Sequence, residues 1–448
     1  MYEEKDMAQR IIERRLARQK RNRRRRAIRI AIAVIIAVVL VATPLIVHLI
    51  KSPVQSVDSP NVSEQTTETT TIEKPTEPYV QSTASIGVTG DILIHKPILE
   101  NAKTADGYNF DNIFTLVNPY FSSYDLMIAN LEITLGGKDK GYSAYPMFNS
   151  PDEVVDSLKK SGVDMVLTAN NHTYDTGLSG MKRTLEVLEN KDVDYIGTRR
   201  TDDGATYKVC DVNGIKIGMA CYTYETPTST AGRKALNGLL LNAEAGPLVN
   251  SFNYNNLSSF YSQAEASIKA MKDSGADAIV FYMHWGNEYQ FTPDNYQKSM
   301  AQKLCDLGVD VIVGGHPHVV QPFDTLTSEN GHETVCIYSM GNAVSNQRKE
   351  IMDPCKTGHT EDGMIFTFSF EKWNDGTVKI SDVNIIPTWV NLKTVNGKKV
   401  YEITPLDIEK GGFSDRGKES YNRTMKLVGE PLNEYRTAHG MSKIQTTV

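Results

Sequence analysis

The chain has 448 residues, 40% of them apolar, which is enough for one large domain or two modest ones with a sizeable buried core. Residues 1–29 carry 12 Lys and Arg against four acids, so the total charge of −6 leaves −14 on residues 51–448, and so acidic a part excludes a broad contact surface for nucleic acid. The five cysteines are odd in number and irregularly spaced, which excludes a zinc-binding CxxC pair and a disulfide framework.

A long apolar stretch near the start of the chain predicts one transmembrane helix. Residues 30–50 read IAIAVIIAVVLVATPLIVHLI, 21 uncharged residues, and a helix needs ~20 to cross a bilayer. Eleven basic residues lie between Arg10 and Arg29, and positive charge beside a span stays in the cytoplasm. We therefore expect a cytoplasmic segment over residues 1–29, an anchor in the cell membrane over residues 30–50, and an extracellular domain after it.

A cleaved signal peptide is the alternative interpretation of this stretch. The apolar core of such a peptide is usually ~7–15 residues long and precedes a small-residue cleavage site. The core here is longer, its basic flank is long, and no convincing Ala-x-Ala sequence follows it, so the sequence favours an uncleaved anchor. Both interpretations export the rest of the chain.

Three further regions follow the anchor. Residues 51–82 are rich in Thr, Ser, Glu and Pro and hold too few apolar side chains to offset the cost of ordering, so we expect a disordered linker. Residues 83–400 have the patterns of a folded domain. Residues 401–448 contain no motif that predicts a function and are expected to form a peripheral C-terminal segment.

Apolar runs and helical periodicity alternate through residues 83–400. The apolar runs predict strands at residues 86–89, 125–129, 164–168, 195–197, 278–283, 310–313, 335–339, 364–370 and 378–386. Helical periodicity predicts helices over about residues 150–161, 179–190, 262–274 and 295–307. This alternation implies a layered α/β or α+β domain.

Local signals set some of the expected boundaries. Ser150 and Glu153 have the spacing of a capping box, so the first of these helices is expected to begin at Ser150 and to end at Gly162. The pair Asn213-Gly214 lies between two apolar runs and predicts a β-hairpin.

Polar side chains recur where the predicted strands end, and ligands of open α/β sheets gather beyond the carboxyl ends of strands. A histidine after a strand is usually structural, and an aspartate there often caps a helix or forms a turn, so each motif alone is weak. Together they favour a metal site. Five such motifs hold four of the nine histidines: Gly90-Asp91, Asn130-x-Glu132, Asn171-His172, His284-Trp285-Gly286 and Gly315-His316-Pro317-His318.

The residue types in these motifs suit a binuclear centre. Such a centre needs carboxylates to neutralise the cations, one of them placed to bridge, and neutral imidazoles to complete the coordination. His316 and His318 are two residues apart, so on an extended segment their side chains share one face. Asn171 offers a neutral oxygen ligand and leaves His172 free to donate a proton. Oxygen and imidazole ligands without thiolate suit two divalent transition metals, manganese, iron or zinc.

The order of the motifs resembles a known family. Gly-Asp, Asn-x-Glu, Asn-Asn-His, His-Trp-Gly-x-Glu, Gly-x-His-Pro-His and Ser-x-Gly-Asn follow one another over about residues 85–390, as in the CapA group of poly-γ-glutamate capsule proteins. That group belongs to the calcineurin-like metallophosphatase superfamily. The resemblance implies a four-layer αββα sandwich and a setting in the synthesis of a capsule or another cell-envelope polymer.

The resemblance also implies roles for individual residues. His172 would lie beside the substrate as general acid, and Asp175 would orient an imidazole. Glu132 would bridge the two metals. The remaining ligands divide between the metals: Asp91 and His318 would hold one, and Asn171, His284 and His316 would hold the other.

Two positions depart from the superfamily pattern. The superfamily usually begins with Asp-x-His, but Leu93 stands two residues after Asp91, and His95 is either its substitute or a residue of the pocket wall. The bridging acid is usually aspartate, whereas Glu132 is one methylene longer. Both changes bear on the occupancy of the first metal site and on whether the protein turns over phosphoesters.

Three functions are compatible with these motifs. The first, favoured, is a metal-dependent hydrolase of the phosphoesterase type that acts on an anionic polymer or a phosphoester. The second is a non-catalytic scaffold that binds membrane capsule-synthase subunits or their nascent polymer. The third is a cell-surface binding protein with structural metals. Because like charges repel, the acidity of residues 51–448 argues against wide contact with a polyanionic product.

Overall fold

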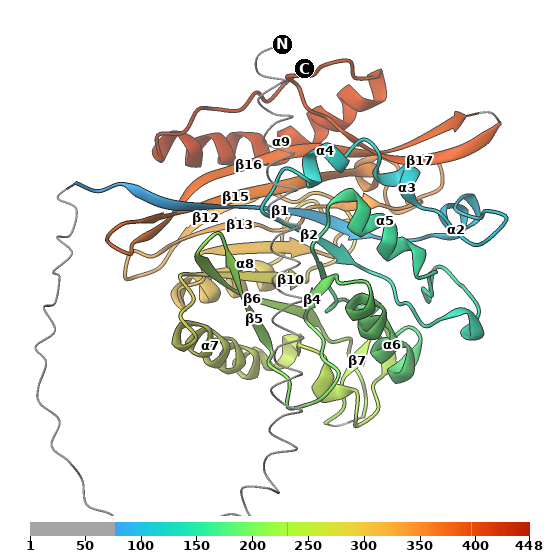
Figure 1. The fold of residues 1–448 in the computed structure, drawn as a ribbon, viewed down its shortest axis with the longest axis horizontal. Helices are drawn as coiled ribbons and strands as arrows, with labels where there is room; N and C mark the ends of the chain where they lie inside the picture. Colours follow the sequence, from blue (N-terminus) through green and yellow to red (C-terminus); the bar gives the residue numbers. More distant parts are fainter. Residues whose placement is uncertain (1–76, 231, 396) are drawn as a thin grey trace, which may run out of the picture. The chain divides into compact units, whose positions relative to one another are not determined.

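Two β-sheets stack face to face in the part of the chain that the computed structural model describes, residues 77–230, 232–395 and 397–448 (Figure 1). Residues 80–448 form one compact unit. The expected cytoplasmic segment, the expected anchor and the linker up to residue 76 lie outside the described residues. No helix of the described ranges has both the length and the apolar character of a membrane span.

The first sheet joins a parallel half to an antiparallel half. In the parallel half lie β1 (Val80–Ile92), β2 (Leu126–Leu131), β3 (Met165–Leu167) and β4 (Asp194–Ile196), and the short β14 (Asn342–Val344) also pairs with β1. The antiparallel half consists of β15 (Asp362–Trp373), β16 (Val378–Val395) and β17 (Lys398–Pro405). β1 therefore begins slightly inside the region expected to be linker.

The second sheet has a parallel centre and antiparallel edges. Its parallel strands are β6 (Ile215–Tyr224), β10 (Ala278–His284), β11 (Val311–Gly315) and β13 (Glu333–Ile337), with the short β9 (Ser251–Phe252) beside β6. Its edge strands are β5 (Tyr207–Val212) and β12 (Phe323–Thr327). The predicted hairpin is confirmed, since Asn213 and Gly214 join β5 to β6 with φ angles of 55° and 85°.

Helices cover both outer faces of the pair of sheets. The apolar side chains between the sheets form one core, and two further cores lie under the helices, so the predicted α/β sandwich is confirmed. Against the first sheet pack α2 (Lys96–Asn101), α3 (Asp111–Phe114), α4 (Asn118–Phe121), α5 (Glu153–Ser161) and α6 (Gly177–Asn190). Against the second pack α7 (Leu257–Asp273) and α8 (Asn295–Asp306). All five cysteines are buried.

Short elements complete the described chain. A small hairpin joins β7 (Ala235–Leu236) to β8 (Leu239–Leu240). The 3-10 turns are η1 (Lys138–Lys140), η2 (Gly246–Leu248), η3 (Tyr254–Asn256) and η4 (His359–Glu361). Of these, η4 directly precedes β15 and supports the site described below.

The C-terminal helix α9 (Asp415–Ala438) corrects the expectation of a peripheral segment after residue 400. It lies along β16 (red in Figure 1) and buries Met425, Val428 and Leu432 in the core between the sheets. Its buried positions 421, 425, 428, 432 and 435 recur at helical spacing. The segment looked peripheral because it carries no polar motif, but its apolar stripe makes it part of the fold.

For the helix expected over residues 150–161, the predicted start is wrong and the predicted end is confirmed. α5 begins at Glu153 with Asp152 as N-cap, and the hydroxyl of Ser150 makes no hydrogen bond, so the expected capping box does not form. Gly162 ends the helix in the left-handed conformation, with φ of 105°. A capping box does form at the start of α8, between Asp294 and Gln297.

The packing of α9 makes a testable prediction about stability. Leu432→Ala should lower the free energy of unfolding of residues 77–448 by about 2–5 kcal/mol, because it leaves a cavity at a fully buried position. Glu434→Ala, on the exposed face of the same helix, should change it by less than about 0.5 kcal/mol. Urea denaturation measures both. Equal, small effects of the two substitutions would show that α9 does not belong to the core.

Candidate metal centre

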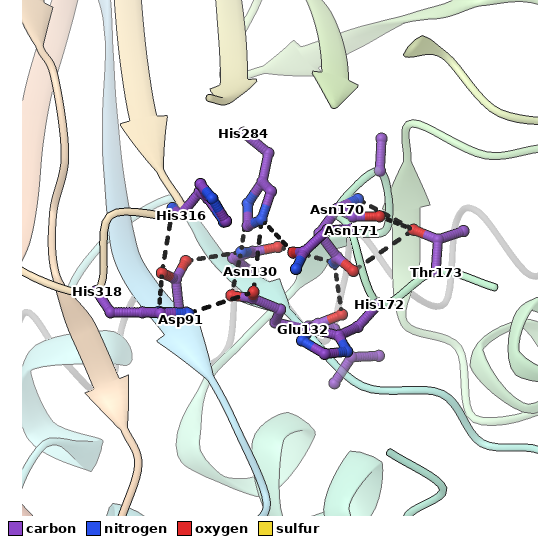
Figure 2. Close-up of polar contacts among 12 residues, drawn as sticks. Asp91, Asn130, Glu132, Asn170, Asn171, His172, Thr173, His284, His316 and His318 are labelled. Carbon is purple, nitrogen blue, oxygen red and sulfur yellow. Dashed lines mark hydrogen bonds and ion pairs between the residues drawn. The ribbon is translucent and has the colours of Figure 1, made fainter. Parts of the chain in front are cut away.

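The parallel strands of both sheets deliver polar side chains to one site (Figure 2). Asp91 lies at the end of β1, Glu132 directly follows β2, and His284 closes β10. Asn171 follows β3, and His316 and His318 follow β11. These six side chains, which the sequence singled out as metal ligands, are at most 3% exposed.

Asn130 is the hydrogen-bond centre of this site. Its Nδ2 donates to Asp91 Oδ1 at 2.7 Å and lies 3.4 Å from both Glu132 Oε2 and His284 Nδ1. Its Oδ1 accepts from Asn170 Nδ2 at 3.2 Å. The sequence placed Asn130 in a motif but gave it no role, because only the packing of β1, β2 and β10 brings its partners together.

The two histidines after β11 converge through a strained turn. The expected extended segment is wrong, since His316 and His318 have φ angles of 96° and 56°. Such backbone costs of order 1–3 kcal/mol per residue and is retained mainly at functional sites. The turn lets the His316 N–H donate to Asp91 Oδ2 at 3.2 Å. The two imidazole centroids lie 5.8 Å apart.

Two overlapping groups of ligand atoms have the spacing of a metal site. One group contains Glu132, His316 and His318, and the other contains Asp91, Glu132 and His284. The ligand atoms of each group lie within 4.8 Å of one another. Because Glu132 belongs to both groups, its carboxylate has the position of a bridging ligand. The grouping differs from the implied one, in which Asp91 shared a metal with His318.

The ligand set contains buried polar atoms that lack a hydrogen-bond partner. Glu132 Oε1 and His316 Nδ1 make no hydrogen bond, whereas buried polar atoms in proteins are nearly always bonded. Glu132 Oε1 lies 3.4 Å from His284 Nε2 and 3.9 Å from His318 Nε2. Asn171 Oδ1 lies 2.7 Å from the same His284 nitrogen. These oxygen and imidazole donors fit a divalent transition metal.

The charge state of the centre follows from its burial. Burial, together with the charges of His284 and His318, holds the pKa of His316 well below its usual value, so His316 is a neutral imidazole. Burial opposes ionisation of Asp91, but the bond to His318, the charges of His318 and His284 and the bond from Asn130 together outweigh burial and lower the pKa of Asp91. For His318, burial is outweighed by Glu132 and Asp91, which raise its pKa to about 9. The site therefore attracts positive charge.

Asn342, at the start of β14, fixes the orientation of His318. His318 Nδ1 lies 3.2 Å from Asp91 Oδ2 and 3.1 Å from Asn342 Oδ1. Both of these oxygens are acceptors, so Nδ1 carries the proton and Nε2 faces Glu132. Asn342 stands in the Ser-x-Gly-Asn motif, whose role the sequence left open. A polar residue that orients an imidazole in this way raises its quality as a ligand.

His172 and Asp175 are in contact beside the centre. His172 Nδ1 lies 2.8 Å from Asp175 Oδ2, which also accepts from the Phe148 N–H at 2.6 Å. The imidazole of His172 stands edge-on to the Phe148 ring, with centroids 4.8 Å apart. The carboxylate and the aromatic ring together hold the imidazole in one orientation.

His95 belongs to neither group of ligand atoms in the described chain. Its Nδ1 accepts from the Asn346 N–H at 3.2 Å, and its ring stands edge-on to Phe148 with centroids 5.3 Å apart. Burial and the charge of His318 lower the pKa of His95 to about 4. Of its two expected roles, this geometry favours a residue of the pocket wall.

Tyr224 is a site residue that sequence reasoning missed. Its ring centroid lies 4.7 Å from that of His316 and 6.5 Å from that of His284, parallel to the latter within 5°. It closes β6, so the rule that found the other residues, a polar side chain at the end of a strand, applies to it too. In the sequence, however, a tyrosine at the end of a strand is equally compatible with a residue of the apolar core.

The chain resembles proteins of capsule synthesis. The family model described as bacterial capsule synthesis protein PGA_cap matches residues 85–347. The capsule biosynthesis protein CapA of Bacillus anthracis is 30% identical over 58% of this chain and 59% of its own length. The PGA biosynthesis protein CapA of Bacillus subtilis (strain 168) is 28% identical over 75% of this chain and 77% of its own.

A more distant relative has a related description. A probable polyglutamine synthesis accessory protein of Mycobacterium tuberculosis (strain ATCC 25618 / H37Rv) is 23% identical over 45% of this chain and 51% of its own length. The chain thus spans 59% and 77% of the two CapA proteins and about half of this third relative.

The central position of Asn130 is open to a direct test. Asn130→Leu should lower the free energy of unfolding of residues 77–448 by about 1–3 kcal/mol, because buried Asp91 Oδ1 loses its 2.7 Å donor. Asn101→Leu, at an exposed position, serves as the matched control and should be nearly neutral. Denaturant titration of both variants without added metal measures the difference. An unchanged free energy of unfolding in Asn130→Leu would contradict the central role of Asn130 in the hydrogen bonds of the site.

Proposed function

We propose that the chain works in the synthesis of poly-γ-glutamate or of another anionic polymer of the cell envelope. The basis of this proposal is that the chain belongs to the PGA_cap family of bacterial capsule synthesis proteins. The names of its two CapA relatives, which refer to capsule and to PGA biosynthesis, support this setting. The identity of the polymer, poly-γ-glutamate or another anionic polymer, is part of this proposal.

We further propose that the buried site holds two divalent transition metals. The ligands would be the six side chains of the site: Asp91, Glu132, Asn171, His284, His316 and His318. One observation carries the proposal, namely that Glu132 Oε1 and His316 Nδ1 are buried among these ligands without a hydrogen-bond partner. When bound, such metals polarise a phosphoryl or carbonyl oxygen and help to generate a nucleophile from water.

The residues beside the centre support a hydrolytic reaction of the phosphoesterase type. Asp175 accepts from His172 Nδ1 at 2.8 Å, which leaves His172 Nε2 available to hold a proton and donate it to a leaving group. The burial of the dyad excludes bulk water and strengthens these interactions.

A scaffold function is the alternative. The mycobacterial relative is described as an accessory protein, and Leu93 replaces the histidine of the superfamily motif. In this alternative the same fold, with weakened metal sites, would bind membrane capsule-synthase subunits or the growing polymer.

For the location of the protein, we propose a single-pass protein of the cell membrane. Residues 30–50 would be the anchor, residues 1–29 would lie in the cytoplasm and the domain after the linker would lie outside the cell. The uncharged stretch and its basic flank carry this proposal.

Metal content tests the proposed centre. Elemental analysis of the purified full chain should find about two equivalents of manganese, iron or zinc, as a binuclear site requires. The double variant His316→Ala/His318→Ala should lose most of this metal because it removes two imidazole ligands. His332→Ala, whose ring bonds Val309 O at 3.0 Å outside the centre, is the matched control and should keep it.

The opposite result separates the two functions. A wild-type chain that is folded but free of metal would contradict the binuclear centre and leave the scaffold as the better explanation. The amount of capsule made by cells that carry the double variant also separates the two functions. Loss of capsule would favour the hydrolase, and an unchanged amount would favour the scaffold.

Protease treatment of intact cells tests the proposed location. With an epitope tag on each end of the chain, added protease should remove the C-terminal tag and leave the N-terminal tag intact, because only the domain is outside. Lysed cells, in which both tags are lost, are the control. Protection of both tags in intact cells would contradict the proposal. Release into the medium of a domain that keeps the C-terminal tag but lacks the N-terminal tag would indicate a cleaved signal peptide.

A further inference from the structure

The support of His318 extends beyond the metal ligands. Asn342, which contacts His318 Nδ1, is fully buried and its Nδ2 lies within bonding distance of three acceptors. These are His318 O at 3.2 Å, Gln347 Oε1 at 2.8 Å and Thr360 O at 2.9 Å. The Thr360 hydroxyl in turn donates to Gln347 O at 2.6 Å. The position of Asn342 therefore depends on the position of the η4 turn.

Two adjacent buried acids follow Thr360. Glu361 is 2% exposed and Asp362 is 1% exposed. Neighbouring carboxylates in such a place repel one another and lose their hydration, so they need paired cations to remain there. The η4 turn can hold Asn342 in place only if these charges are matched.

The matching groups come mainly from α9. Arg423 donates from Nε and Nη2 to the two oxygens of Asp362, at 2.7 and 2.6 Å. Ser420 Oγ donates to Asp362 Oδ1 at 2.6 Å. Arg416 Nη2 lies 3.0 Å from Glu361 Oε2. Positions 416, 420 and 423 share one face of the helix.

Three groups outside α9 complete the pairing of Glu361. Arg348 Nη2 lies 2.9 Å from Glu361 Oε2, Trp389 Nε1 donates to the same oxygen at 3.1 Å, and the Lys349 N–H donates to Oε1 at 2.9 Å. Arg348 is itself only 4% exposed and directly follows Gln347. Asp362, by contrast, has cationic partners only from α9 among the described residues.

We propose that α9 is a positioning element of the metal centre. Its Arg423 and Ser420 fix Asp362 and the η4 turn, and the turn fixes Asn342 and thereby His318. The inference rests on the proposed metal centre and extends it to a helix that lies outside residues 85–347, the part matched by the family model. Hydrogen bonds join Arg423 to Asp362, Asn342 to Thr360 O and His318 to Asn342, and the backbone of residues 360–362 connects Asp362 to Thr360.

Loss of the Arg423 guanidinium leaves Asp362 as a buried carboxylate with one hydroxyl partner. The turn then shifts to reach water, and Asn342 loses its acceptor at Thr360 O. His318 Nδ1 then loses one of its two acceptors, Asn342 Oδ1, and keeps Asp91 Oδ2, so its ring is less firmly oriented. Partners that orient a ligand in this way typically change metal affinity by about 10–100-fold.

The test measures Co²⁺ binding by the metal-depleted full chain, through the visible absorption of the bound ion and its titration. Arg423→Gln should weaken Co²⁺ binding by about tenfold or more and alter the absorption bands, because the ligand geometry changes. Arg423→Lys, which keeps the charge but not the two-pronged contact, should fall between this variant and the wild type.

Arg436→Gln is the matched control. Arg436 lies on the same helix, is 8% exposed and pairs with Asp382 at 2.8 Å, but contacts neither η4 nor its acids. It should lower thermal stability while leaving Co²⁺ affinity within about twofold of the wild type and its absorption bands unchanged. A comparable loss of affinity in Arg436→Gln would mean that α9 acts through stability alone, and would overturn the inference.

The remaining outcomes are also decisive. Wild-type affinity and absorption in a folded Arg423→Gln would overturn the inference while leaving the proposed centre intact. Absence of Co²⁺ binding by the wild type would overturn the centre and the inference with it. If Arg423→Gln does not fold, Ser420→Ala takes its place, since it removes only the 2.6 Å bond to Asp362. A severalfold weaker Co²⁺ affinity would then support the inference, and an unchanged one would overturn it.

Discussion

Two buried carboxylates, Asp91 and Glu132, impose the main constraint on this structure. Neither side chain has measurable exposure, and one oxygen of Glu132 has no hydrogen-bond partner. Burying such charges is costly unless donors or cations compensate. Asn130, the backbone N–H of His316 and the imidazole of His318 supply part of this compensation. The rest would come from the proposed metals, so the architecture around the site can be understood as the means of holding negative charge inside a sandwich.

The fold meets this constraint by using strand ends from both sheets. A single sheet presents its parallel strand ends in a row, whereas two stacked sheets enclose a site from opposite sides. The first sheet contributes the carboxylates and Asn171, and the second contributes the three histidines. The left-handed backbone at His316 and His318 is the local cost of this enclosure. Arg423 and Ser420 of α9 pair with Asp362, directly after η4, so the hydrogen bonds around the site continue to the C-terminal helix.

The sequence predicted the members of the site better than their connections. A polar side chain at the end of a buried parallel strand is visible in the sequence, so Asp91, Glu132 and His284 could be singled out. Asn130 and Asn342 were in recognised motifs, but their partners lie in other strands, and pairing between distant strands leaves no local signal. The grouping of the ligands also depends on distances that only the folded chain has. The expected capping box at Ser150 failed because Asp152, two residues later, became the N-cap instead.

The sequence by itself determined the α/β class, the approximate strands and helices, the hairpin at Asn213-Gly214 and the identity of most candidate ligands, because each of these follows from local periodicity or from chemistry at strand ends. Only the tertiary structure decided that Glu132 is shared between two groups of candidate ligand atoms, that His95 belongs to neither group, and that α9 packs into the core and pairs with Asp362. These features arise from contacts between segments far apart in the chain. Such contacts depend on how complete sheets and helices pack, which short stretches of sequence do not encode.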